Sequence, residues 1–87
     1  MKFMATWSVI PGKNEAVIRK FQEESEPMEG YTQLGRWNEV GTGRGFRLIE
    51  ADDLVGVTKG ILHWQDLLDI KLVPVIDDEE IVKALGG

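Results

Sequence analysis

The chain contains no cysteine among its 87 residues. This absence excludes a disulfide framework, a thiolate metal site and a cysteine nucleophile, and it fits a protein of the cytoplasm, where we expect the chain to work. His63 is the only histidine, so a zinc site built on a histidine pair is excluded. Acidic residues gather at 23–29 and 77–80, and we interpret both groups as helix ends and solvated faces rather than metal sites. We therefore expect neither a metal nor a cofactor.

Long apolar runs and an excess of positive charge are also missing. No run of about 18 apolar residues occurs, so we expect no membrane-spanning helix. Polar residues interrupt the apolar N-terminal stretch too early for a signal peptide. The chain has 10 basic and 15 acidic residues, which give a formal net charge of −5. Because an acidic chain repels phosphate backbones, nucleic-acid binding is not expected.

What the sequence does contain is a series of short extended segments. Four runs are apolar or alternating and are bounded by turn residues, which predicts β-strands over Lys2–Ile10, Tyr31–Val40, Arg44–Ala51 and Asp69–Ile76. The turn Gly41-Thr42-Gly43 separates the second run from the third and predicts an antiparallel hairpin. Pro74 lacks the N–H that a central strand donates, so the fourth strand is expected at an edge of the sheet.

Helical spacing appears in three places. The first helix is predicted over Asn14–Ser25 and stops before Pro27. The last predicted helix is short, begins at Asp77 and runs to Leu85. Asp77 and Glu80 have the spacing of a capping box.

The second helix is predicted after Asp52 or Asp53, either of which can cap it. It carries an apolar stripe at three- and four-residue spacing, formed by Leu54, Val57, Ile61, Trp64 and Leu68. Gly56 and Gly60 lie inside the helix, where glycine costs up to about 1 kcal/mol against alanine. We interpret both as positions of close packing against the sheet.

The order βαββαβ with a short terminal helix predicts an α+β, ferredoxin-like fold with a four-stranded antiparallel sheet, formed by residues 1–87 as a single domain. Helices would cover one face of that sheet and leave the other bare. A chain this short buries only about 60–65% of its unfolded surface. The bare apolar face therefore predicts a homodimer in which a second copy covers it.

Four segments carry a resemblance to a known family: MKFMATWSVIPG, LGRWNEVGTGRGFRLIEADD, HWQDLLD and VPVIDDEE. Together they resemble an uncharacterised family, a domain of unknown function, within the dimeric α+β barrel superfamily, and the match spans nearly the whole chain. The resemblance implies a ferredoxin-like fold and a homodimer whose sheets pack face to face. It implies no activity, because the family has no assigned reaction.

Five residues are candidates for a ligand pocket between the sheet and the second helix: Trp7, Arg36, Asn38, His63 and Trp64. In the superfamily that the chain resembles, small apolar ligands occupy this space. An arginine on a pocket wall favours a ligand with a carboxylate, since the planar guanidinium matches that group. Plain structural roles fit the same residues: core aromatic side chains, a histidine at a helix end, surface arginines, or a buried ion pair between Arg36 and Glu50.

Three functions remain open on the sequence. The first is a homodimer that binds a small molecule without catalysis. The second is a cofactor-free monooxygenase or isomerase acting on an aromatic or polyketide-like substrate, and the third is a structural interaction module. Haem degradation, known elsewhere in the superfamily, is not expected. That branch carries asparagine where this chain has Trp7. It also depends on a tryptophan and a histidine arranged on the second helix, whereas His63 and Trp64 are adjacent here and point about 100° apart.

Overall fold

The secondary structure follows the predicted order. The computed structural model describes residues 1–24 and 28–86, so the predicted helix end at Ser25 and the stop at Pro27 lie outside the described residues. Within them, the elements are β1 (Lys2–Val9), α1 (Asn14–Glu23), β2 (Tyr31–Asn38), β3 (Arg44–Ala51), α2 (Val55–Trp64), β4 (Leu68–Val75) and α3 (Asp78–Ala84). The order of strands and helices is confirmed. The described ends lie close to the predicted ones, and β2 stops at Asn38 rather than Val40.

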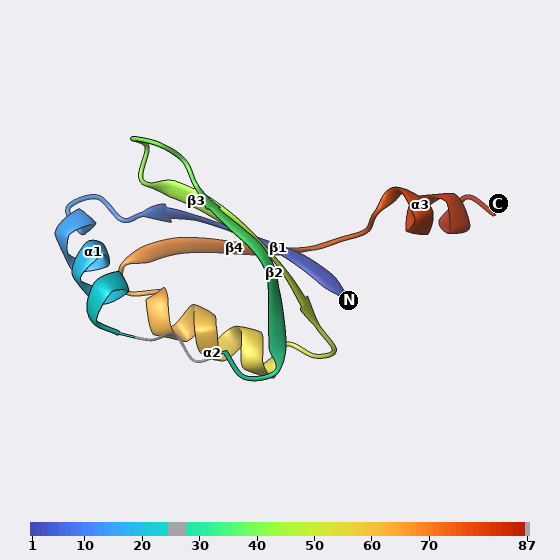
Figure 1. The fold of residues 1–87 in the computed structure, drawn as a ribbon, viewed down its shortest axis with the longest axis horizontal. Helices are drawn as coiled ribbons and strands as arrows, with labels where there is room; N and C mark the ends of the chain where they lie inside the picture. The colour runs from blue at the N-terminus through green and yellow to red at the C-terminus, as the bar shows by residue number, and fades with distance from the viewer. Residues whose placement is uncertain (25–27, 87) are drawn as a thin grey trace.

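The four strands form one antiparallel sheet in the order β2-β3-β1-β4. This is the ferredoxin-like arrangement, so the predicted fold is confirmed. Strand β4 lies at an edge, as expected from Pro74. Helices α1 and α2 lie against the same face of the sheet, which is called the inner face below (Figure 1). The opposite, outer face carries no helix among the described residues.

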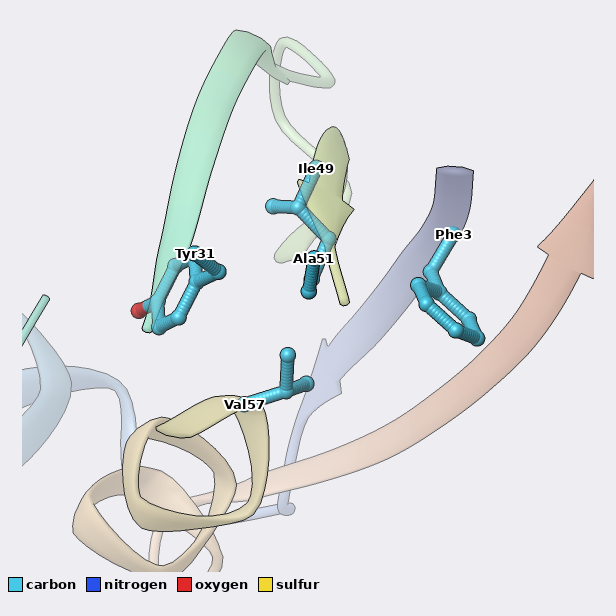
Figure 2. Packing of buried hydrophobic residues seen from close by; sticks show 5 residues of the cluster. All are labelled: Phe3, Tyr31, Ile49, Ala51 and Val57. Atoms are coloured by element: carbon cyan, nitrogen blue, oxygen red, sulfur yellow. The ribbon is translucent and has the colours of Figure 1, made fainter. Parts of the chain in front are cut away.

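The core lies between the inner face and α2. Figure 2 shows Phe3 of β1, Tyr31 of β2, and Ile49 and Ala51 of β3 gathered around Val57 of α2. Ile49 and Val57 are the most deeply buried, with 0% and 1% of their surface exposed. These residues occupy the end of the sheet near the start of α2, so the other end of the inner face is left for a site.

A β-bulge in β2 decides which side chains face the helices. Gln33 pairs with Ile49, but Gly35 pairs with Leu48, so Leu34 is an extra residue in β2. One extra residue moves every following side chain to the opposite face. Arg36 and Asn38 consequently face the helices, whereas Trp37 lies on the outer face beside Phe46 at a ring-centroid distance of 5.5 Å.

Two glycines in the hairpin strands lie beneath tryptophan rings. A Cβ at Gly45 would lie 2.4 Å from Cζ2 of Trp7, its partner across β1 and β3 on the inner face. A Cβ at Gly35 would lie 2.3 Å from Cη2 of Trp37 on the outer face. The absence of a side chain at each glycine lets an indole lie flat over the strand. At Gly45 this indole is that of Trp7, which lies on the inner face.

The start of α2 differs from the prediction in two ways. The helix begins at Val55, and the Asp53 carboxylate accepts the Val55 N–H at 2.9 Å, one residue outside the capping position occupied by Leu54. Gly56 packs against the turn before β2 rather than against the sheet, because a Cβ there would lie 1.8 Å from the carbonyl oxygen of Glu29. Gly56 is thus a close-packing position, but the prediction that it packs against the sheet is wrong.

Helix α3 projects beyond the sheet, away from α1 and α2 (Figure 1). Its predicted capping box is present: Asp77 accepts the Glu80 N–H at 2.9 Å, and the Glu80 carboxylate accepts the Asp77 N–H. The Asp77 carboxylate also lies 3.5 Å from Nζ of Lys2, which links the start of α3 to β1. Helix α3 buries none of its residues in the chain, and the exposed apolar residues around it include Ile81, Val82 and Leu85.

Candidate functional site

A cavity of about 360 Å³ lies between the inner face and the two helices. Its walls are mainly apolar, and every strand contributes to them. The lining residues are Ala5 and Trp7 of β1; Val17, Ile18, Phe21 and Gln22 of α1; Arg36 and Asn38 of β2; Arg47 and Ile49 of β3; Val57, Ile61 and Trp64 of α2; and Leu68, Ile70 and Leu72 of β4. The core thus continues along the inner face into an open apolar space.

Four of the five predicted site residues come together around this cavity: Trp7, Arg36, Asn38 and Trp64. His63 is not among the described residues that line it. Its imidazole lies edge-on to the ring of Trp64 at a centroid distance of 5.5 Å, and its Nε2 is buried without a hydrogen-bond partner among the described residues. A role for any of the five in binding remains a prediction.

Lys20 joins the two helices at the edge of the cavity. Its ammonium group donates to the carbonyl oxygen of His63, lies 3.5 Å from Oδ1 of Asp66, and lies 5.4 Å from the ring centroid of Trp64. The side chain of Lys20 is only 14% exposed, so these contacts are partly shielded from solvent. Lys20 therefore holds the C-terminal end of α2 against α1 and positions Trp64 as a wall.

Arg36 reaches the cavity from β2 and lies against an aromatic ring of α1. Its Cζ atom is 5.1 Å from the ring centroid of Phe21, a cation–π distance. The hypothesis of an ion pair between Arg36 and Glu50 is wrong. Glu50 is exposed and alternates with the buried residues Ile49 and Ala51, so it lies on the outer face while Arg36 faces inward.

Arg47 is the site residue that sequence reasoning did not single out. It is 8% exposed, lines the cavity, and lies directly opposite Arg36 across β2 and β3. Its Cζ atom is 5.4 Å from the ring centroid of Tyr31. The signal was present in the alternation of β3, because Arg47 shares its face with Ile49 and Ala51.

The lining residues can enclose an apolar molecule and offer it a few polar groups. Among the described residues that line the cavity, two carry positive charge, two carry amides, and none carries a carboxylate, an imidazole or a hydroxyl. The described part of the chain contains no group of three or more His, Cys, Asp or Glu residues that could hold a metal ion. No helix in that part has the length and apolar character needed to cross a membrane.

Comparison with known proteins gives one result. Neither the curated proteins nor the solved structures gave a significant match. A family model, however, matches residues 1–87, the whole chain. Its description is that of a domain of unknown function, DUF3303. The match agrees with the resemblance drawn from the four sequence segments, and the chain belongs to the family described as the domain of unknown function DUF3303.

Proposed function

We propose that the protein binds a small, mainly apolar molecule in the cavity between the sheet and helices α1 and α2. The cavity itself carries the proposal: its volume of about 360 Å³ lies within the usual range of roughly 300–1,000 Å³ for small-molecule pockets. Protein interiors are ordinarily packed without voids. A short chain that keeps an open apolar space beside its core has a packing arrangement suited to a guest molecule.

Binding fits the cavity better than catalysis does. A general base must be an ionisable side chain within hydrogen-bond reach of the proton it removes. The described lining residues offer guanidinium and amide groups, which donate hydrogen bonds but do not take up a proton from a substrate. The cofactor-free monooxygenase or isomerase therefore gains no support from the groups around the cavity.

A neutral fluorescent probe, N-phenyl-1-naphthylamine, tests the proposal. We expect its emission to rise on binding, with one probe per chain. Ile61→Trp places an indole in the cavity and should abolish the rise. Leu62→Trp is the matched control, because Leu62 is the next residue of α2, is exposed and does not line the cavity. Failure of the probe to bind the wild-type protein, or equal binding to both variants, would contradict the proposal.

We further propose that the protein works as a homodimer, a dimeric α+β barrel, in which the outer faces of two sheets pack together. The outer face carries Met4, Trp37, Phe46, Leu48, Val73 and Val75. Trp37 is 52% exposed in the single chain, so a large aromatic surface is left uncovered. At one end of this face Glu39 and Asp69 lie with Arg44 and Lys71, a balanced set of charges that suits contact with a second copy.

The area that a stable dimer needs also favours a role for α3. A specific interface usually buries about 800 Å² on each partner. Four strands of eight residues make a face of roughly 26 by 19 Å, or about 500 Å² before side-chain relief. The exposed apolar residues of α3 can supply part of the difference, because α3 extends beyond the end of its own sheet, past the last residue of β4 (Figure 1).

Sedimentation velocity at micromolar concentration tests the dimer. We expect the wild-type chain to sediment as a dimer and Trp37→Glu to sediment as a monomer, since a carboxylate on the outer face would be buried without a partner. Leu62→Glu is the control, because it places the same charge on an exposed position of α2. A wild-type monomer would overturn the dimer but would leave the cavity proposal intact.

A further inference from the structure

We infer that α3 is an arm that packs its apolar side against a second copy of the chain, and that the helix is stable only when it is docked there. The inference rests on the dimer proposed above and names a part of the interface that lies outside the two sheets. Four observations carry it: the uncovered apolar side of α3, the shortness of the helix, the point from which it leaves the sheet, and the area that the sheets alone can bury.

Helix α3 has one apolar side, and its own chain leaves that side uncovered. Ile81, Val82 and Leu85 have the three- and four-residue spacing of an apolar stripe and are 45%, 54% and 81% exposed. Glu79 and Lys83 lie on the opposite side, since each residue of a helix turns by about 100°. A surface helix normally turns such a stripe toward a core. Helix α3 therefore has the sequence of a packed helix, yet none of its residues is buried in the single chain.

A helix as short as α3 needs a surface to pack against. It has 7 residues, and isolated helices shorter than about 12–15 residues are marginal in water, because the first turn is costly to form. The capping box of Asp77 and Glu80 satisfies N–H groups at one end only. Ile76 and Ile81 have the spacing of a hydrophobic staple, which also acts at that end. These local signals specify a helix, but its stability has to come from packing.

The arm reaches well beyond the core of its own chain. Figure 1 shows α3 at one end of the longest dimension of the molecule, which is 49 Å. The radius of gyration is 14.7 Å. A compact chain of this length has a radius of gyration of about 12 Å. The single chain is thus more extended than a self-contained domain, and its apolar arm is open to a surface from another copy.

The start of α3 is joined to the face that is proposed to pair. The carboxylate of Asp77 lies 3.5 Å from Nζ of Lys2. Lys2 alternates with the buried inner-face residue Phe3 and pairs with Glu50 and Val75, so it lies on the outer face. The arm therefore begins at the rim of the proposed interface. This continuity favours a second copy of the chain, rather than an unrelated protein, as the surface that α3 meets.

The area of the interface leads to the same occupant. A helix of 7 residues is roughly 10 Å long and 10 Å wide, so one arm covers about 100 Å². In a two-fold dimer each copy both gives an arm and receives one. Two arms raise the face of about 500 Å² on each copy to about 700 Å², close to the roughly 800 Å² that a specific interface buries on each partner.

Ile81→Gln tests the arm by sedimentation equilibrium over a dilution series. Glutamine forms helices at least as well as isoleucine, so the change removes the apolar contact and keeps the helix propensity. We expect the dimer Kd to rise about 10- to 100-fold, because a two-fold interface loses the contact twice. Lys83→Gln is the matched control on the opposite side of α3 and should change the Kd by less than about twofold. Both side chains are exposed in the chain, so both variants should fold.

Nuclear magnetic resonance shows which chain the arm touches. Labelled and unlabelled chains are refolded together in equal amounts, and isotope-filtered spectra select contacts between copies. We expect such contacts from the methyl groups of Ile81, Val82 and Leu85. We also expect the α3 amides to exchange slowly with solvent in the wild-type dimer, and as fast as in an unstructured peptide in the Trp37→Glu monomer.

The outcomes separate the arm from the dimer. A wild-type dimer without contacts between copies at α3, or one whose Kd is unchanged by Ile81→Gln, overturns the arm and keeps the dimer. Equal weakening by Ile81→Gln and Lys83→Gln also overturns the arm, as does equal protection of the α3 amides in the Trp37→Glu monomer. A wild-type chain that stays monomeric at micromolar concentration overturns the dimer and the arm together.

Discussion

Alanine at Gly45 and alanine at Gly35 should have different effects, although both glycines lie under a tryptophan ring. At Gly45 the new Cβ would lie 2.4 Å from Cζ2 of Trp7 and 2.8 Å from the backbone carbonyl oxygen of Trp37. At Gly35 the three nearest atoms all belong to the ring of Trp37. That ring is 52% exposed in the chain and can rotate away, whereas a backbone oxygen inside a sheet cannot.

The magnitudes follow from two opposing terms. An added methyl group in a packed site costs about 1–3 kcal/mol. Replacing glycine by alanine returns about 0.4–1 kcal/mol, because it restricts the unfolded chain. With a backbone clash the cost at Gly45 lies near the upper end, so we expect a net loss of about 2 kcal/mol. At Gly35, ring rotation relieves the clash, and we expect a net change within about 1 kcal/mol of zero.

Urea unfolding followed by circular dichroism measures both changes. The experiment is run at several protein concentrations, because Trp37 lies on the face proposed to pair and a dimer would couple stability to concentration. Gly45→Ala should also push the Trp7 ring into the cavity and weaken binding of N-phenyl-1-naphthylamine. An equal loss for the two variants, or a larger loss for Gly35→Ala, would refute the reasoning.

Three further predictions concern stability. In the same urea assay, Gly56→Ala should destabilise the chain by about 3 kcal/mol or more, since its Cβ would lie 1.8 Å from the carbonyl oxygen of Glu29. Lys59→Ala, on the exposed side of α2, is the control and should change stability by less than about 1 kcal/mol. Ile49→Ala should cost about 2–5 kcal/mol, because Ile49 is 0% exposed; a loss below about 1 kcal/mol would contradict its place at the centre of the core. The hydrogen bond from the Glu80 N–H lowers the pKa of Asp77 below its ordinary value of 3.8, so the cap stabilises α3 above that value and the stabilisation disappears as the pH falls through the lowered pKa. Carboxyl carbon chemical shifts measured against pH should show a pKa of Asp77 below its ordinary value, and an ordinary pKa would contradict the capping role.

The order of elements could be predicted because local signals agreed with the final fold. Pro74 indicated an edge strand, the glycines of the hairpin loop indicated a turn, and the spacing of Asp77 and Glu80 predicted the capping box; each of these is confirmed. In every case the physical cause acts within a few residues. Sequence patterns carry such short-range causes directly.

The composition of the site was harder to predict, because it depends on one bulge. Gly35 is the one local sign of it, because an isolated glycine inside a strand often marks a bulge. Only the pairing of the strands shows that the extra residue brings Arg36 and Asn38 inward and puts Trp37 outside. The predicted ion pair between Arg36 and Glu50 failed for a similar reason, because it depended on which face of the sheet each side chain occupies. Glu50 pairs with Thr32 and Lys2, and these pairs lie on the outer face. Long-range register cannot be read from a single strand.

Arg47 and His63 show the limits of choosing residues by type. Arginine is usually exposed, so its residue type gave no reason to place Arg47 at the cavity, although it shares a face with Ile49 and is 8% exposed. His63 was chosen because histidine often performs proton chemistry. The structure places it beside Trp64 but outside the described lining of the cavity. Position on the inner face, rather than residue type, decides which side chains meet a ligand.

The three tryptophans provide the most direct test of the central claim, because their indole N–H groups report separately in a ¹⁵N–¹H correlation spectrum. Trp7 and Trp64 line the cavity, and Trp37 lies on the outer face. On titration with N-phenyl-1-naphthylamine, binding in the cavity predicts that the indole signals of Trp7 and Trp64 shift together while that of Trp37 stays in place. A shift of Trp37 alone, or no shift of Trp7 and Trp64 at saturating probe, would contradict a ligand site between the sheet and the helices.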